Sequence, residues 1–214
     1  DKPVVAVITS MAQPLGTHIG NALEVKDAID VLAGRTQGDL LEISLLLGSH
    51  MLVLAEKART LPEARAMLEN ALSSGAGLRK LAEMIAAQGG DPRVVEDLSL
   101  LPQAAVKRVM QAETAGYLSE MDTTALGMAA QRMGAGRAKK SDMLDYSVGY
   151  VLHVRLGDEV TEDTPLATLY ARNEAEAEEA EKAIRKALTI ARKKPQTPKL
   201  WDAVVTAEGI TYNR

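Results

Sequence analysis

The stretch that decides the fold is Met11-Ala-Gln-Pro-Leu-Gly-Thr-His-Ile-Gly-Asn-Ala-Leu-Glu-Val-Lys-Asp-Ala-Ile-Asp30. It follows a short apolar run, residues 4–8, which is typical of a strand. Pro14 and Gly20 then indicate a loop, because proline fixes one backbone angle and glycine adopts conformations that a side chain forbids. The sequence therefore predicts a strand followed by a tight loop.

A helix is predicted to begin directly after this loop. Asn21 is the predicted N-cap, and Glu24 stands where it can complete a capping box. Apolar residues then recur at helical spacing as far as Leu32, and Gly34 supplies a stop. From spacing alone, the favoured interpretation of this stretch is an ordinary connection between a strand and a helix without a special function.

The composition limits the class of protein. A chain of 214 residues with 46% hydrophobic and 25% charged residues is long enough for one or two globular domains. The net charge of −4 gives no basic field that would attract nucleic acid, so no nucleic-acid partner is expected. The absence of cysteine excludes disulfides and thiolate metal sites, and it fits a reducing cytoplasm.

Residues 40–58 form the most apolar segment of the chain. Glu42, His50 and Glu56 interrupt it, so that it lacks the run of roughly 20 apolar residues that a membrane span needs. We therefore expect a buried core helix and no membrane partner, with His50 in a hydrogen-bonded structural role. A further helix is expected after the N-cap Thr60.

Leu101-Pro102 indicates a domain boundary, which divides the chain into residues 1–102 and 103–214. The first part is predicted to be one strand followed by helices, as a remnant of a mixed-sheet α/β domain. The second part is predicted to be an α+β domain, with a helix over 123–133 capped by Asp122 and another from Asn173 to about Lys194. Its strand candidates are 106–112, 117–121, 150–155, 166–170 and a closing strand at 200–206.

The strand predicted at residues 4–8 needs partners in a sheet, and no obvious candidate follows for most of the next hundred residues. Unpaired strands are costly and prone to aggregation. We therefore expect that residue 1 is not the natural beginning of the protein. The other strands of the sheet are expected upstream or on a second polypeptide.

Several short motifs, in order along the chain, resemble the pyrimidine-nucleoside phosphorylase and thymidine phosphorylase family. The motifs are Gln13-Pro14-Leu15-Gly16, Ile19-Gly20-Asn21-Ala22-Leu23-Glu24-Val25, Leu101-Pro102-Gln103, Leu126-Gly127, Gly134-Ala135-Gly136-Arg137-Ala138, Val148-Gly149-Tyr150-Val151-Leu152-His153 and Gly157-Asp158. The resemblance covers the C-terminal half of the family, whose members are considerably longer than this chain.

The resemblance implies a pentosyltransferase of nucleotide salvage. Members of the family cleave thymidine- or uridine-type nucleosides with inorganic phosphate as co-substrate, giving the free base and ribose or deoxyribose 1-phosphate, without an organic cofactor. Their phosphate-binding and pyrimidine-binding residues lie upstream of the matched segment, so no catalytic or substrate-binding residue is assigned here. The resemblance implies a cytoplasmic homodimer as the parent protein, and a fragment that is inactive alone.

One site of the family carries over in part, a site for a monovalent cation, by implication potassium. The matching positions are Leu15 and His18, through their main-chain carbonyls, and Asp27, through its carboxylate. Hard oxygen ligands of this kind suit alkali cations. Position 18 is His where relatives often have Ala, and position 27 is Asp where some have Glu. The alternative is that Asp27 faces solvent together with Glu24.

A second functional hypothesis is a non-enzymatic carrier or regulatory module derived from the same family. Gly149, Gly157-Asp158 and Pro165 resemble half of a biotinyl- or lipoyl-carrier fold, with a barrel-sandwich-type β core. Such carriers present a modifiable lysine at the tip of a hairpin, for which Lys139 and Lys140 are the candidates here. The family's C-terminal domain has the same core without a prosthetic group, and fold alone does not assign a function.

Overall fold

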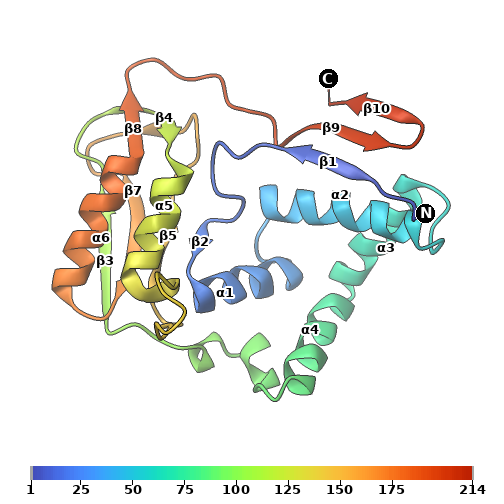
Figure 1. Cartoon of the computed structure of the whole chain (residues 1–214), viewed down its shortest axis with the longest axis horizontal. Coiled ribbons are helices and arrows are strands. Elements are labelled where there is room, and N and C mark those ends of the chain that lie inside the picture. The colour runs from blue at the N-terminus through green and yellow to red at the C-terminus, as the bar shows by residue number, and fades with distance from the viewer. Residues whose placement is uncertain (1, 214) are drawn as a thin grey trace. The chain divides into compact units, whose positions relative to one another are not determined.

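A computed structural model describes residues 2–213 of the chain, which mix helices with several antiparallel sheets (Figure 1). By spatial contact the chain divides into two compact units, which are described separately. The first unit combines residues up to Ser10 with Ala28–Asp97 and the segment from Lys199 onward. The second combines Met11–Asp27 with Leu98–Pro198.

The first unit is built mainly from helices, as the periodic apolar pattern predicts. Helix α1 begins in the second unit and continues into the first. A small core of buried Val31, Leu41 and Leu45 joins α1 to α2, with Leu68 and Leu72 of α3 packed against it. The helices are α1 (Asn21–Leu32), α2 (Asp39–Leu54), α3 (Leu61–Ser73) and α4 (Ala76–Ala87), followed by the short 3-10 helix η1 (Pro92–Val95).

The predicted N-caps are confirmed at three helices, by Thr60, Asp122 and Asn173. Each side chain accepts a hydrogen bond from the backbone N–H three residues later, at 3.3, 2.8 and 2.9 Å respectively. These bonds satisfy donors that the first turn of a helix leaves without an intrahelical partner. The local sequence therefore fixes where these three helices begin.

The first unit also contains a three-stranded antiparallel sheet with the order β1-β9-β10. Its strands are β1 (Ala6–Thr9), β9 (Trp201–Thr206) and β10 (Gly209–Tyr212). The expectation that the first strand lacks a partner on this chain is wrong, because the predicted closing strand, β9, pairs with it. That pairing joins opposite ends of the sequence, so no local pattern reveals it. The other edge of β1 carries no strand within residues 2–213.

The second unit contains two antiparallel sheets that hold most of the predicted strands. One has the order β2-β5-β7-β3 and the other β6-β4-β8. The first comprises β2 (His18–Ile19), β5 (Gly149–Leu152), β7 (Pro165–Ala171) and β3 (Val106–Gln111). The second comprises β6 (Glu159–Val160), β4 (Gly116–Met121) and β8 (Leu188–Ala191).

Two helices of the second unit pack on each other and on these sheets. Helix α5 (Thr123–Ala130) continues as a π-helical segment, Gln131–Ala135, and α6 is Glu174–Ala187. The principal core of the chain lies here, and its largest fully buried side chains are Tyr150, Met110, Leu118, Leu126, Leu152, Leu166, Leu169 and Ile184. The second unit therefore has a substantial core of its own.

Helix α6 is shorter than predicted. It ends at Ala187 instead of about Lys194, because Leu188 adopts an extended conformation with φ −113° and ψ 129° and opens strand β8. The β-branched residues Thr189 and Ile190 then pair with β4. Pairing with β4 thus overrides the helical propensity that the sequence after Ala187 has on its own.

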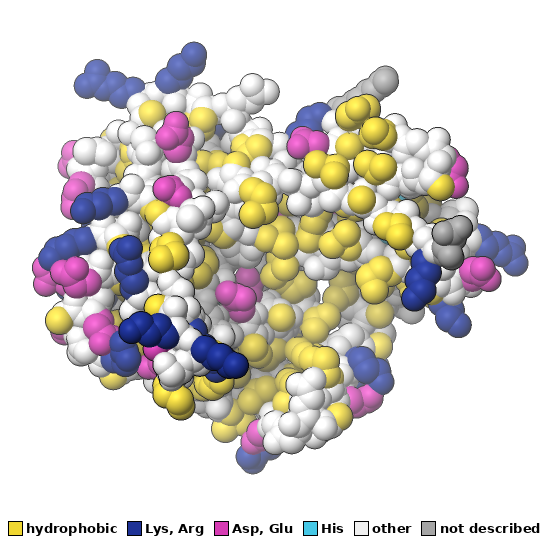
Figure 2. Space-filling model, viewed as in Figure 1, with side chains coloured by type: hydrophobic (Ala, Val, Ile, Leu, Met, Phe, Trp, Pro, Cys, Tyr) yellow, Lys and Arg dark blue, Asp and Glu magenta, His cyan; other side chains and the backbone are white. Residues whose placement is uncertain are grey.

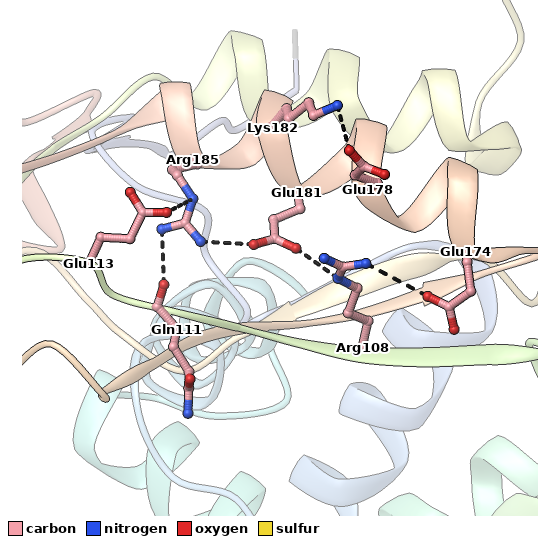
Figure 3. Close-up of polar contacts among 8 residues, drawn as sticks. All are labelled: Arg108, Gln111, Glu113, Glu174, Glu178, Glu181, Lys182 and Arg185. Carbon is pink, nitrogen blue, oxygen red and sulfur yellow. Dashed lines mark hydrogen bonds and ion pairs between the residues drawn. The ribbon is translucent and has the colours of Figure 1, made fainter.

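A network of ion pairs attaches α6 to β3 (Figure 3). Glu181 of α6 accepts hydrogen bonds from Arg108 of β3 and from Arg185 one turn later, both at 2.8 Å. Arg185 also donates to the carbonyl of Gln111 at 2.9 Å and lies 3.3 Å from Glu113. Glu181 thus joins two arginines at a position that is largely shielded from water.

Helix α2, the most apolar helix predicted from the sequence, is 16 residues long. Among residues 2–213, the structure has no helix that combines the length and the apolar character needed to cross a bilayer.

Candidate functional site

Hydrogen bonds fix the loop that contains Leu15 against the turn after β5. The Arg155 guanidinium donates to the Pro14 carbonyl at 2.6 Å through Nη1 and to the Leu15 carbonyl at 3.4 Å through Nη2. The backbone N–H of Leu156 donates to the Gln13 side chain at 3.0 Å. The Pro14 and Leu15 carbonyl oxygens are therefore held in place by hydrogen bonds, although these residues do not lie in a strand.

Strand β2 sets the orientation of the His18 carbonyl. Leu152 N–H donates to the Thr17 carbonyl at 2.8 Å, and His18 lies opposite Val151 in the register. In an antiparallel pair the hydrogen-bonded positions alternate, so His18 occupies a non-hydrogen-bonded position. Its carbonyl accordingly points to the side of β2 opposite to β5.

Two glycines allow β2 and β5 to approach closely. A Cβ atom on Gly20 would lie 2.5 Å from the Val148 carbonyl oxygen, and one on Gly149 would lie 2.1 Å from the Ile19 carbonyl oxygen. Both glycines also have positive φ, 137° and 147°, which other residues rarely adopt. Both positions therefore require glycine if β2 and β5 are to pair.

The start of α1 differs from the prediction. Gly20, and not Asn21, occupies the N-cap position, because its carbonyl accepts the first intrahelical bond from Glu24 N–H at 2.8 Å. The Glu24 carboxylate accepts from the Gly20 N–H at 3.3 Å, four residues back, and not from the Asn21 N–H, so the predicted capping box between Asn21 and Glu24 is wrong. Asn21 is the first helical residue, and its side-chain amide donates to the Ala135 carbonyl at 2.8 Å. This long-range partner explains why the predicted cap is wrong.

Asp27 is buried, with 4% of its surface exposed, whereas Glu24 is exposed. The alternative that Asp27 simply faces solvent is therefore wrong. Its Oδ1 lies 3.5 Å from His18 Nδ1, which in turn lies 3.0 Å from the Thr17 hydroxyl. Lys26 Nζ lies 3.5 Å from the other ring nitrogen of His18. The site thus contains a buried carboxylate next to an imidazole.

The predicted cation ligands can be compared with the donors that the structure offers around Asp27. Among residues 2–213, no three or more His, Asp and Glu side chains gather in a way that could hold a metal ion. A cation here would therefore depend on main-chain carbonyls together with the single carboxylate of Asp27. Such neutral and singly charged oxygens fit an alkali cation better than a transition metal. The Arg155 guanidinium at the Leu15 carbonyl would be a neighbouring positive charge.

The surroundings of two titratable groups in the second unit shift their pKa values. The hydroxyl and backbone N–H of Ser147 donate to Asp145 at 2.6 and 2.9 Å and lower the pKa of its carboxyl group. Burial raises the pKa of Tyr150, whose hydroxyl donates to the Leu126 carbonyl at 2.8 Å. Tyr150 is therefore a neutral structural donor at physiological pH.

The other two histidines, His153 and His50, lie away from Asp27 in the sequence and are described by their own contacts. His153 Nε2 lies 2.7 Å from the Thr168 hydroxyl. His50 is buried in α2, and its Nε2 has no hydrogen-bond partner among the described residues, so the expected hydrogen-bonded role is wrong for this atom. Burial lowers the pKa of His50, which favours the neutral imidazole.

The candidate carrier lysines, Lys139 and Lys140, lie in an exposed turn after the π-helical segment. The Asp142 carboxylate accepts from the backbone N–H groups of Ala138 and Lys139, at 3.1 and 2.8 Å. This turn does not join two strands that pair with each other. A carrier would need its lysine at the tip of a hairpin, so the geometry disfavours that alternative.

The fold and the site together define a class, an α+β protein in which the loop around Leu15 and His18 offers main-chain oxygens next to the buried Asp27 carboxylate. A family model described as the pyrimidine nucleoside phosphorylase C-terminal domain matches residues 117–191. These residues hold α6 and all of β4 except its first residue, Gly116.

Curated relatives extend this likeness over most of the chain. The chain is 50% identical over 173 residues to a pyrimidine-nucleoside phosphorylase of Bacillus subtilis (strain 168), covering 81% of this chain and 40% of that protein. It is 49% identical over 173 residues to the one of Geobacillus stearothermophilus, with the same two coverages. It is 44% identical over 186 residues to the one of Staphylococcus aureus (strain USA300), covering 87% of this chain and 43% of that protein.

The chain thus belongs to the pyrimidine-nucleoside phosphorylase family and corresponds to its C-terminal half, as the sequence motifs predict. It spans about two fifths of the length of the curated relatives that it matches.

Proposed function

We propose that this chain is the C-terminal part of a pentosyltransferase that performs reversible phosphorolysis of thymidine- or uridine-type nucleosides. Inorganic phosphate is the co-substrate, and the products are the free base and ribose or deoxyribose 1-phosphate. The observation that carries this proposal is the 44–50% identity to pyrimidine-nucleoside phosphorylases over most of the chain. Identity at this level, spread over both compact units, supports a shared reaction.

The chain alone is expected to be inactive. An oxocarbenium-like transition state needs a phosphate anion anchored beneath the sugar, and anions are bound by N–H donors and cationic side chains. The loop described above instead offers carbonyl oxygens and the buried Asp27 carboxylate, which repel an anion. The phosphate and nucleoside sites are therefore assigned to a portion of the enzyme outside this chain.

The parent enzyme is further proposed to be a cytoplasmic homodimer. The absence of cysteine supports a reducing compartment.

The division of the sequence at residues 102 and 103 stays a prediction, as does the carrier-like, barrel-sandwich-type core of the C-terminal domain. The antiparallel sheets of the second unit support the prediction of a barrel-sandwich-type core.

The potassium half-site is proposed at Leu15, His18 and Asp27. Burial of an ionised carboxylate is costly unless a cation or hydrogen bonds offset it, and Asp27 is buried beside a loop whose carbonyls are fixed. When bound, the cation would neutralise the carboxylate and stiffen the loop. The remaining ligands would come from the rest of the enzyme.

The half-site predicts a potassium dependence that Asp27 controls. The chain is combined with the remaining portion of a phosphorylase, and activity is titrated with KCl at constant ionic strength set by choline chloride. The variant Asp27→Asn should raise the KCl concentration for half-maximal activity by roughly tenfold or more. Asp91→Asn, at an exposed position in the first unit, serves as the control. An unchanged potassium dependence in Asp27→Asn would remove Asp27 from the site.

The reaction is tested with the same combined preparation. Thymidine and uridine are each incubated with and without inorganic phosphate, and the release of free base and pentose 1-phosphate is followed. The proposal expects base release that depends on phosphate, in equal amount with pentose 1-phosphate. Release of free base together with free pentose in the absence of phosphate would identify a hydrolase instead.

The carrier alternative is tested by intact-mass analysis of the chain purified from its native host. A lipoyl or biotinyl adduct on Lys139 or Lys140 would favour a carrier. The phosphorylase proposal expects an unmodified chain.

A further inference from the structure

A basic turn, residues 137–140, follows the π-helical segment of the second unit. Its cationic side chains are Arg137, Lys139 and Lys140, and all three are exposed. Within residues 2–213, these three side chains have no hydrogen-bond or ion-pair partner. Figure 2 shows Lys and Arg side chains over the part of the molecule where Figure 1 draws this turn, at the lower end of α5. The turn therefore concentrates positive charge in a chain whose net charge is −4.

Hydrogen bonds fix the backbone of the basic turn. The Gln131 side chain donates to the Arg137 carbonyl at 2.7 Å. The Asp142 carboxylate, the nearest acidic group along the chain, accepts from two backbone N–H groups of the turn at 3.1 and 2.8 Å. Just before the turn, the Asp145 N–H donates to the Gly134 carbonyl at 3.0 Å. The cations are therefore carried on a backbone of defined shape, which lowers the entropy lost when a ligand binds.

The basic turn leads out of a pocket of about 350 Å³ between the start of α1 and the end of α5. The pocket wall includes Ala135 and Gly136, which directly precede the turn. It also includes Gln131, where the π-helical segment begins, and such segments are frequent at functional sites. The volume falls within the range of small-molecule sites. The side chains of the wall that can bind a ligand are Asn21, Glu24, Met128 and Gln131.

The polar groups of this pocket complement the edge of a pyrimidine base. The edge of uracil or thymine presents one N–H between two carbonyl oxygens. Glu24 is exposed and accepts from the Gly20 N–H, and its carboxylate has further lone pairs to accept the base N–H. Asn21 and Gln131 each donate one N–H to a main-chain carbonyl, and each amide has a second N–H for a base carbonyl. The exposed thioether of Met128 suits contact with the ring.

The charges of the pocket and of the basic turn orient such a ligand. The Glu24 carboxylate repels a phosphate from the pocket, whereas the cations of the turn attract phosphate next to it. Lysine and arginine are the usual side chains that bind phosphate. Three cations match the charge of a triphosphate better than that of a single phosphate. The base is therefore expected in the pocket and the phosphates at the turn.

We propose that the pocket and the basic turn together form a binding site for a pyrimidine nucleoside triphosphate. The base lies in the pocket, and the phosphates contact the three cationic side chains of the turn. A nucleoside triphosphate is neither a substrate nor a product of the proposed phosphorolysis. The site therefore goes beyond the proposed function, and its test does not depend on that reaction.

The site is tested by isothermal titration calorimetry of this chain with UTP as the probe. Uridine and inorganic tripolyphosphate are the comparison ligands, and the buffer lacks divalent cations so that the phosphates keep their charge. The test variant of the turn is Lys139→Ala with Lys140→Ala. Its matched control is Lys193→Ala with Lys194→Ala, a second pair of exposed lysines in the same unit.

A second variant, Gly127→Leu, tests the pocket. Gly127 lines the pocket, and a Cβ atom there would meet no atom within 4 Å, so leucine fills the pocket without a clash at its Cβ. Circular dichroism verifies that all variants remain folded.

We expect the wild-type chain to bind UTP roughly tenfold more tightly than either uridine or tripolyphosphate. The double variant of the turn should weaken UTP binding roughly tenfold or more, whereas its control should leave it nearly unchanged. Gly127→Leu should weaken the binding of UTP and leave that of tripolyphosphate unchanged.

Four outcomes would overturn the proposal. The first is a wild-type chain that does not bind UTP. The second is tripolyphosphate that binds as tightly as UTP, since the turn would then attract any polyanion. The third is an equal loss of UTP binding in the two double variants, which would indicate an effect of net charge alone. The fourth is a Gly127→Leu variant that binds UTP like wild type, since the base would then lie outside the pocket.

Discussion

At the scale of single residues, Gly149 allows strand β5 to approach strand β2 closely. Gly149→Ala should lower the free energy of unfolding by about 2 kcal/mol or more, because the new Cβ meets the Ile19 carbonyl and the backbone has positive φ. Gly127→Ala is the matched control. Gly127 lies inside α5 with open space around it, so alanine there should stabilise by about 0.5–1 kcal/mol. Urea denaturation measures both changes, and a Gly149→Ala variant as stable as wild type would contradict the close approach.

His50 gives the chain a predictable dependence on pH. Burial lowers its pKa in the folded state below the ordinary value of about 6.5, so the unfolded chain binds a proton first as pH falls. The contribution of neutral His50 to stability is therefore fully present above pH of about 6.5 and is lost as pH falls toward its folded pKa. Unfolding measured between pH 7.5 and 5.5 should show a loss of stability that His50→Leu reduces. Identical pH profiles for wild type and His50→Leu would contradict the assignment.

The candidate site could be predicted from sequence only in part. The motif around Gly20 identifies the loop and the family, whereas the Glu24 carboxylate accepts from the Gly20 N–H instead of the Asn21 N–H that the predicted capping box needs. The burial of Asp27 and the partner of Asn21 could not be predicted, because both depend on residues far away in the sequence. Spacing on a helix shows which residues share a side, but not what covers that side.

At the scale of secondary-structure elements, Glu181 attaches α6 to β3. Glu181→Gln should lower the free energy of unfolding by about 1 kcal/mol, because it weakens two ion pairs and leaves two arginines close together. Glu178→Gln is the control, since Glu178 pairs with the exposed Lys182, and it should change stability by less than about 0.5 kcal/mol. The difference between the variants should shrink in high salt. Equal effects of both substitutions in urea denaturation would contradict a special role for Glu181.

The elements themselves were predictable where their signals are local. The caps Thr60, Asp122 and Asn173 begin helices as expected, and the predicted strands recur within a few residues of their expected bounds. The prediction failed where pairing is non-local. The tail of α6 becomes β8 because β4 offers a partner, and β1 is paired by β9 from the opposite end of the chain.

At the scale of the whole molecule, the two compact units differ in how complete they are. The second unit has a large core with many fully buried side chains. The first has a small core, exposed Leu47, Met51 and Leu54 on α2, and an open strand edge on β1 within the described residues. The two units therefore differ in how much apolar surface they bury within the described residues.

The most direct test of the central claim is phosphate-dependent cleavage of thymidine and uridine by three preparations. They are this chain alone, the separate remaining portion of the Bacillus relative, and the two together. We predict base and pentose 1-phosphate from the combined preparation and no turnover from either portion alone. Phosphorolysis by this chain alone would contradict the claim that its reactive pocket is built by residues it does not contain.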